Sequence, residues 1–186
     1  GTLSPTRGSL LVRGKVAPIL TIGAGFNPRF TGLENVLLNA SILGLRDSEI
    51  ASKLDAIAKF ADIGRFFQLP VRFYSTGMYS RLAFAVAIHP DPDVLVIDET
   101  LAVGDEAFAR KCFARIDEIK KQGTTILFVS HSARHVLELA DRALLLEGGE
   151  RIMIGSPKTV MSAYHRILYT TSSERSHMIQ ELRSRD

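Results

Sequence analysis

The chain lacks features that several classes of protein require. Its 186 residues include a single cysteine, which excludes an intramolecular disulfide and a cysteine-based metal site. No apolar run approaches the length that spans a bilayer, and no secretory signal is visible. No basic run stands out, and a net charge of +3 is too small to indicate nucleic-acid binding. We therefore expect a reducing, cytoplasmic setting and no nucleic-acid partner.

The remaining composition is that of an ordinary soluble globular protein. Apolar residues make up 46% of the chain and charged residues 23%, and 186 residues are enough for one domain with a buried core. Because the chain begins at Gly1 without a methionine, we predict that it is a fragment of a longer protein.

The most informative stretch is a short apolar run that ends in two adjacent carboxylates. Residues 94–97 are β-branched or aliphatic, and a turn cluster with two prolines precedes them. This pattern predicts a strand buried on both faces, as in a parallel sheet. Asp98 and Glu99 follow at the carboxyl end of this strand, where such strands carry chemistry, with their side chains on opposite sides. One carboxylate can orient a hydrated divalent metal while the other faces an attacking water, and an ordinary acidic turn is the plainer alternative.

A second candidate site lies where a polar turn opens into an apolar, alanine-rich helix. Ser75 is a good N-cap for that helix. The exposed amides and the positive end of the dipole of such a helix attract an anion. A capped core helix without a ligand is the alternative. An anion-binding helix start followed at short range by a strand that ends in two carboxylates is the arrangement that a nucleotide enzyme needs.

The remaining patterns predict an alternation of strands and helices. Before the polar turn we expect strands over residues 9–16 and 16–22 and a helix that runs from a capping box at Thr31 and Glu34 to about Gly44. A second helix is expected over residues 48–63, with Gly64 as its C-terminal cap. After the carboxylates we expect a helix over 106–121, a buried strand over 124–129, a helix over 133–140, a hairpin over 143–154 and a helix over 157–168. The buried side of the helix over 106–121 is marked by Phe108, Cys112, Ile116 and Ile119.

Two further features lie in the C-terminal part of the chain. His131 follows the strand over 124–129, so it can reach the same sheet edge as the two carboxylates, and capping of the next helix is the plainer alternative. Residues 170–186 are polar, which predicts a linker or a frayed tail.

Taken in this order, the elements resemble the ATP-binding subunit of ABC transporters over roughly residues 1–165. Residues 75–79 are similar to the family's signature loop, with Met78 and Tyr79 in place of its second Gly and its Gln. The strand that ends at Asp98 resembles the Walker B strand, and Glu99 the catalytic carboxylate after it. Residues 101–105 resemble the D-loop and His131 the switch histidine. Three loops, 23–26, 74–78 and 101–105, look most like ATPases that export polysaccharide, such as O-antigen, capsule or teichoic acid chains.

The resemblance implies a fold and a site. The fold would be the α/β fold of P-loop NTPases, with a mostly parallel sheet, a helical subdomain over about 31–88 and a truncated N-terminus, so that residues 1–168 form a partial ATPase domain and 169–186 a tail. The cofactors would be ATP and Mg²⁺, with Asp98 holding the metal, Glu99 as general base and His131 at the γ-phosphate. The residues that contact the nucleotide of an opposite subunit would be Ser75, Thr76, Gly77 and Met78. The resemblance places Asp105 at the interface of that homodimer.

The resemblance also implies a transmembrane permease as partner, and a peripheral position at the cytoplasmic face of the inner membrane. Residues 22–30 are where we expect the permease to touch. Two departures from the family pattern matter. No Gly-x-x-x-x-Gly-Lys-Ser/Thr loop is present, and the glycine-rich loop at 23–28 lacks the ending that would make it one. No glutamine stands at Thr21 or Ile22, where the family's Q-loop residue would fall.

These departures set the expected activity. We predict an ATPase in the intact protein, and poor or absent ATP binding in this chain alone, because the phosphates lose their amide cradle and lysine. A degenerate ABC-like module that binds a partner without hydrolysing ATP is the main alternative. A soluble ABC protein outside transport is the third hypothesis.

Overall fold

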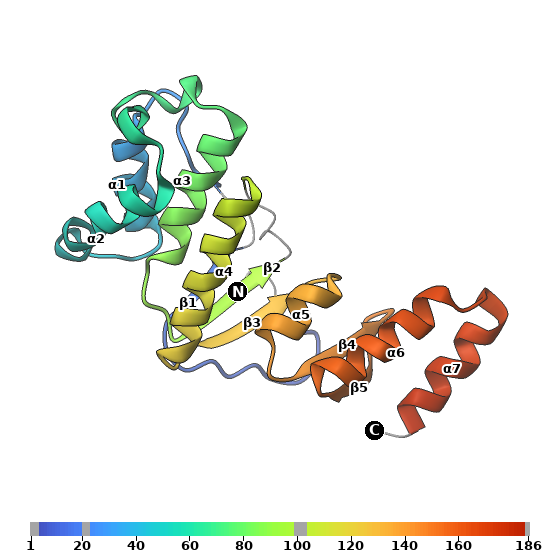
Figure 1. Ribbon diagram of the computed structural model, residues 1–186. Coiled ribbons are helices and arrows are strands. Elements are labelled where there is room, and N and C mark those ends of the chain that lie inside the picture. The colour runs from blue at the N-terminus through green and yellow to red at the C-terminus, as the bar shows by residue number, and fades with distance from the viewer. Residues whose placement is uncertain (1–3, 20–22, 99–103, 185–186) are drawn as a thin grey trace. The chain divides into compact units, whose positions relative to one another are not determined.

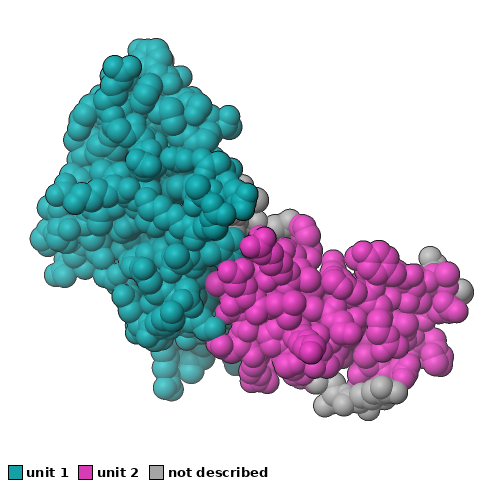
Figure 2. All heavy atoms as spheres, in the orientation of Figure 1, with its two compact units in different colours: residues 1–127 teal, residues 128–186 magenta. Residues whose placement is uncertain are grey.

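The computed structural model describes residues 4–19, 23–98 and 104–184 (Figure 1). The chain divides into two compact units, residues 1–127 and 128–186, which Figure 2 shows in separate colours. Within the described residues, no helix is long and apolar enough to cross a membrane. Each unit combines strands with helices, which agrees with the predicted α/β class.

A three-stranded sheet has the order β1-β2-β3. Its strands are β1, Val16–Ile19, β2, Val94–Asp98, and β3, Thr125–Val129, which crosses the boundary between the units. β1 and β2 are parallel, with Val16 opposite Val94 and Ile19 opposite Ile97, which confirms the parallel pairing predicted for the carboxylate strand. Residues 9–15 form no strand, contrary to the prediction.

One face of β1 and β2 is well buried, whereas no residue of β3 is fully buried. Ala17 and Leu95 pair side by side and are 5% and 1% exposed. On the other face Val16 is 42% exposed, and Leu127 and Val129 in β3 are 57% and 58% exposed. In β2 the second face, with Val94 and Val96, is only half-buried, so the prediction of a strand buried on both faces is wrong for the described chain. The prediction of a buried strand over 124–129 is wrong as well. An apolar sequence shows what a strand can bury and not what covers it.

The predicted helical part over 31–88 is present. It consists of α1, Gly32–Ile42, α2, Asp47–Ala61, two short 3₁₀ helices, Gly64–Gln68 and Val71–Phe73, and α3, Thr76–Ile88, and α1, α2 and α3 pack against one another (Figure 1). The Thr31 capping box is confirmed, since the Glu34 amide donates to Thr31 Oγ1 at 3.1 Å and the Thr31 amide donates to Glu34 Oε2 at 2.7 Å. The cap of α2 differs from the prediction: Asp62, with φ 50°, takes the left-handed position, and Gly64 begins the first 3₁₀ helix.

Helix α4, Glu106–Lys121, has the predicted bounds and packs on α3. Its four predicted buried residues, Phe108, Cys112, Ile116 and Ile119, are all at most 3% exposed. Three aromatic rings join the helices: Phe60 of α2 lies 6.2 Å from Phe84 of α3 and 5.6 Å from Phe108 of α4, between ring centroids. This aromatic contact fixes the first turn of α4 against the side of α3.

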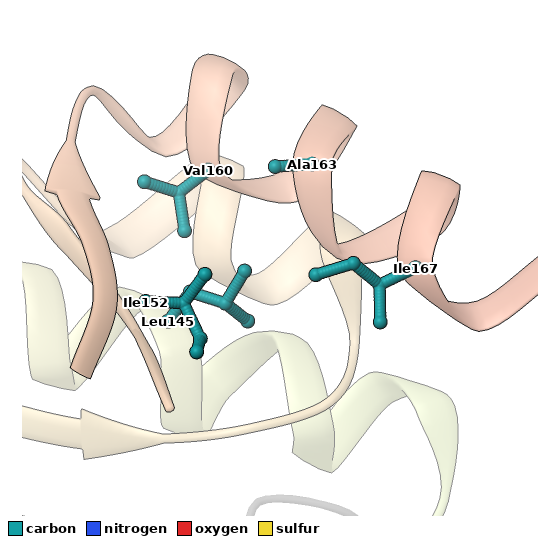
Figure 3. Packing of buried hydrophobic residues seen from close by; sticks show 5 residues of the cluster. All are labelled: Leu145, Ile152, Val160, Ala163 and Ile167. Atoms are coloured by element: carbon teal, nitrogen blue, oxygen red, sulfur yellow. The ribbon is translucent and has the colours of Figure 1, made fainter. Parts of the chain in front are cut away.

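The second unit begins with the end of β3 and continues through α5, Ala133–Leu139, and an antiparallel hairpin. The hairpin strands are β4, Ala143–Glu147, and β5, Glu150–Gly155, joined by two glycines that both have positive φ. Helix α6, Pro157–Tyr169, starts with the predicted proline. Figure 3 shows how α6 closes the core of this unit, where side chains of α6 point at those of the hairpin. The five core residues are Leu145, Ile152, Val160, Ala163 and Ile167.

The polar segment at the end of the chain is a helix and not the frayed tail that its composition predicts. Helix α7 is Ser172–Ser184, and Met178, Ile179 and Leu182 pack against the core of the second unit. Arg175 Nη2 lies 2.6 Å from Glu147 Oε1, and Arg183 forms an ion pair with Glu150. The hairpin thus supplies the apolar surface and the carboxylates that order a weakly amphipathic sequence. The assignment of residues 1–168 to one ATPase domain stays a prediction.

Candidate functional site

The predicted metal ligand lies at the end of a strand. Asp98 is the last residue of β2, and its side chain is exposed beyond the buried Ile97. Glu99, the predicted general base, and residues 100–103 of the predicted D-loop lie outside the described residues. Among the residues that the structure does describe, no three His, Cys, Asp or Glu side chains form a metal-binding group. A single exposed carboxylate suits Mg²⁺, which is usually held by one or two carboxylates, several waters and phosphate oxygens.

The start of α3 has the geometry that the sequence predicts. Ser75 is extended, with φ −69° and ψ 161°, and its hydroxyl accepts a hydrogen bond from the Met78 amide at 3.2 Å. Ser75 and Thr76 are exposed. A Cβ added to Gly77 would meet only Ser75 Oγ, at 3.9 Å, so the space beside the first turn of the helix is open. The amides of a first helical turn lack intrahelical partners, so this open helix start can receive an anion.

Asp105 caps α4 and is bound to α3. Its carboxylate accepts hydrogen bonds from the Phe108 amide at 2.9 Å and from Arg81 Nη2 at 2.5 Å. The Phe108 amide first, and then the Arg81 side chain, lower the pKa of Asp105 below its ordinary value. The Arg81 guanidinium also lies 5.1 Å from the centre of the Phe108 ring, and Nη1 donates to the Asp62 carbonyl at 3.4 Å.

Arg81 is a residue that the sequence analysis missed. It lies one helical turn after Gly77, on the helix that carries the predicted signature loop, and it holds the first turn of α4 in place. The helical spacing from Gly77 was a signal that could have drawn attention to it. Its partner Asp105 is 24 residues away in the sequence, and no local pattern connects the two.

Tyr79 was also missed as a contact residue. Its hydroxyl donates to the Gly23 carbonyl at 2.8 Å, across 56 residues, and its ring meets Phe26 edge-on with centroids 5.3 Å apart. The far side of this loop is anchored by Asn35, whose side chain bonds both the amide and the carbonyl of Asn27, at 2.7 and 3.0 Å. The predicted contact loop for the permease is therefore ordered over residues 23–30.

An apolar groove of about 290 Å³ opens beside this loop. Gly23 and Phe26 line it from the loop, Ile42 and Leu43 from the end of α1, and Ala83 and Val86 from α3. Ile42 is 66% exposed, so the groove ends in an apolar lip at the surface.

His131 belongs to the second unit, between β3 and α5, and its side chain is exposed. It does not cap α5, because the capping oxygen is that of Ser132, which accepts from the His135 amide at 3.5 Å. The plainer alternative for His131 is thus wrong. Ser75, Asp98 and Asp105 belong to the first unit, and the gathering of these residues with His131 at one sheet edge stays a prediction.

Solved structures show the class of fold. The chain matches an ATP-binding subunit of an ABC transporter with a TM-score of 0.69 and 21% identity, over 90% of this chain and 68% of that one. It also matches a dimeric ATP-binding cassette in a post-hydrolysis state bound to ADP and Pi, with a TM-score of 0.61 and 21% identity, over 77% of this chain and 63% of that one. At these identities the likeness shows the fold alone, and that fold is the predicted α/β fold of an ABC ATPase.

Known relatives define the family, although no protein-family model matches the chain. The chain is 49% identical to the ABC transporter protein AbcA of Aeromonas salmonicida, over 98% of this chain and 59% of that protein. It is 43% identical to the O-antigen export system ATP-binding protein RfbB of Klebsiella pneumoniae, over 90% of this chain and 68% of that protein. It is 46% identical to the teichoic acids export ATP-binding protein TagH of Levilactobacillus brevis, over 88% of this chain and 45% of that protein.

The chain belongs to the family of ABC transporter ATP-binding proteins, as the resemblance of its motifs indicated. It spans between 45% and 68% of the length of these three relatives.

Proposed function

We propose that this chain is part of the ATP-hydrolysing subunit of an ABC exporter for polysaccharide or polyol phosphate polymers. The observation that carries the proposal is the 43% identity to an O-antigen export ATP-binding protein over 68% of its length. The similarity to a teichoic acids export protein supports the same kind of cargo. The open start of α3 and the exposed carboxylate at the end of β2 are consistent with a nucleotide site.

The residues of this chain have separate parts in the proposed reaction. Asp98 would hold Mg²⁺, which would supply positive charge to neutralise the phosphates. Glu99 takes the proton of the attacking water as general base, and His131 contacts the γ-phosphate. Because phosphoryl transfer depends on positioning and charge neutralisation, these side chains need only be held in place when the nucleotide arrives.

A homodimer completes the proposed site. The residues that close over the nucleotide of the opposite subunit are Ser75, Thr76, Gly77 and Met78. Asp105 lies at the same interface, where its bond to Arg81 joins the start of α4 to the helix that carries the closing residues. The exposure of Ser75 and Thr76 and the open space beside Gly77 support this assignment. The dimeric state of the ADP-bound neighbour supports it as well.

The proposed partner is a transmembrane permease, which keeps the protein at the cytoplasmic face of the inner membrane. The apolar groove beside residues 23–30 is the proposed contact. An apolar segment of the permease would cover Phe26 and the exposed Ile42. Burial of that surface gives the association its driving force.

The test of the proposed function is Glu99→Gln in the intact protein. Because a general base contributes on the order of 100-fold or more to rate, ATP turnover should fall by at least that factor while ATP-dependent dimerisation persists. Glu106→Gln is the matched control, since Glu106 is an exposed carboxylate of α4 that pairs with Arg110, and it should leave turnover near the unsubstituted level. Hydrolysis at the normal rate in Glu99→Gln would show that the assigned base is wrong.

The same assay separates the alternatives. Measured on this chain and on the intact protein, it tests the prediction that this chain alone is inactive. An intact protein that binds its permease but hydrolyses no ATP would favour the degenerate interaction module.

A further inference from the structure

Tyr79 replaces the glutamine of the family's signature loop, and in the structure its side chain contacts the glycine-rich loop. The Tyr79 hydroxyl donates to the Gly23 carbonyl at 2.8 Å, across 56 residues. The ring packs edge-on against Phe26, with an interplanar angle of 60°. A glutamine at this position could not supply the ring contact, so Tyr79 is suited to join α3 to the glycine-rich loop.

The loop is shaped to receive this ring. Gly23 has φ +79°, in the left-handed region that favours glycine. A Cβ added there would lie 2.6 Å from both Cε1 and Oη of Tyr79, closer than side-chain atoms can approach. The Gly23 carbonyl also accepts the Phe26 amide at 3.0 Å, so the turn of the loop and the bond to Tyr79 share one oxygen.

The glycine-rich loop is also held by hydrogen bonds at Asn27. Asn35 is fully buried and bonds both main-chain groups of Asn27. Gly23 and Phe26 line the apolar groove that is the proposed permease contact. A displacement of these two residues therefore reaches Tyr79 directly, because the part of the loop beyond them is anchored to α1.

We propose that Tyr79 is a positioning residue that couples the occupant of this groove to the closing residues at the start of α3. The Tyr79 amide donates to the carbonyl of Ser75 at 2.9 Å, and the hydroxyl of the same residue caps the Met78 amide. Movement of the loop thus re-aims Ser75 and the first turn of the helix. This inference rests on the proposed function, since it assigns the signal that the permease sends to the nucleotide site.

Hydrogen exchange in the isolated chain tests the coupling without any activity. Tyr79→Phe removes the hydroxyl and keeps the ring, and one lost hydrogen bond corresponds to about 2- to 10-fold faster exchange. We expect that increase both at the Phe26 amide and at the Met78 and Tyr79 amides. Tyr74→Phe is the matched control, because the Tyr74 hydroxyl donates to the Phe66 carbonyl at 2.7 Å and not to the loop. Faster exchange at Phe26 alone, with the start of α3 unchanged, would overturn the proposal.

Turnover in the intact exporter provides the second readout. In proteoliposomes that contain the permease, the ratio of ATP turnover with permease to turnover without it should fall several-fold in Tyr79→Phe, with an unchanged KM for ATP. Tyr74→Phe should keep the ratio. Gly23→Ala, which drives a Cβ into the Tyr79 ring, should reproduce the loss from the loop side.

The two ideas fail in different ways. An unsubstituted protein that is stimulated by the permease, together with an equally stimulated Tyr79→Phe, overturns the coupling and leaves the function standing. An intact protein without ATP turnover refutes the function, and the exchange rates at Met78 and Tyr79 then decide whether Tyr79 positions the helix start.

Discussion

Asn35 offers the sharpest test of how the loop beside α3 is held. It is a fully buried polar side chain in the first turns of α1. Its Oδ1 accepts the Asn27 amide at 2.7 Å, and its Nδ2 donates to the carbonyls of Asn27, Phe30 and Thr31 at 3.0, 3.2 and 2.9 Å. One side chain therefore forms hydrogen bonds with main-chain groups on both sides of the turn that leads into α1.

The cost of Asn35→Ala follows from which of these groups keep another partner. Each of the three carbonyls keeps a backbone donor. The Phe30 amide donates to Asn27, the Val71 amide to Phe30, and the amide of residue 35 itself to Thr31. The Asn27 amide, which is part-buried, loses its hydrogen bond, and this costs about 1–2 kcal/mol, toward the lower end of the range for a buried group. With the weaker loss at the carbonyls and the small cavity, we expect the free energy of unfolding of the first unit to fall by about 2–4 kcal/mol.

Asn35→Asp removes the Nδ2 donor of Asn35 and keeps its Oδ1 acceptor. The carboxylate keeps the bond to the Asn27 amide, but it sets a buried negative charge against three carbonyl oxygens. Burial and these oxygens raise the pKa of the new carboxyl in the folded state above its unfolded value. The destabilisation is therefore fully present above the folded pKa and disappears as the pH falls, because the protonated carboxyl can donate to one carbonyl.

The assay is urea unfolding of each variant between pH 5 and pH 8, with exchange of the Asn27 amide followed in parallel. Ser41→Ala on the exposed side of α1, where the hydroxyl donates to the Leu37 carbonyl, is the control and should change stability by less than about 0.5 kcal/mol. An Asn35→Asp variant as stable as the unsubstituted chain at pH 8, or a destabilisation that grows on acidification, would refute the reasoning.

Three further predictions follow from other contacts. Arg81→Ala should raise the pKa of Asp105 toward its ordinary value. A carboxyl whose pKa is lowered in the folded state stabilises the fold above its unfolded pKa, so the variant should lose less stability than the unsubstituted chain as the pH falls. The pH dependence of the Asp105 carboxyl carbon chemical shift measures the pKa, and an unchanged titration would contradict the prediction. Ile152→Ala, at a position 1% exposed in the second core, should cost about 2–5 kcal/mol in thermal unfolding, and a loss below that of Ile152→Val would be inconsistent with the packing. Ser75→Ala should cost about 1 kcal/mol and Ser75→Gly only a few tenths, and equal losses would count against the cap.

Much of the fold was open to prediction because its signals are local. The capping box at Thr31, the cap at Ser75 and the bounds of α4 each depend on residues within one or two helical turns. The parallel strand that ends at Asp98 was predicted from the apolar run over residues 94–97. In each case the hydrogen bonds or the apolar period lie within the segment itself, so the surroundings have little to decide.

The candidate site was predictable only in part. The residue types at Ser75, Gly77 and Asp98 follow from their positions at the ends of regular elements, where main-chain amides or exposed carboxylates are expected. The same reasoning missed Tyr79 and Arg81, since a helix position shows which face a side chain occupies and not which distant group it meets.

The sequence by itself determined the start of α1, the start of α3, the bounds of α4 and the position of β2. It also indicated that the start of α3 and the end of β2 carry polar groups suited to a phosphate and a metal. The tertiary structure alone decided that Tyr79 bonds Gly23, that Arg81 bonds Asp105 and that the polar segment at the end of the chain folds as α7 on the hairpin. The physical reason is the sequence separation of the residues that interact. Caps and apolar periods are set by neighbours within a few residues, whereas a contact across 24 or 56 residues exists only once packing has brought its two partners together.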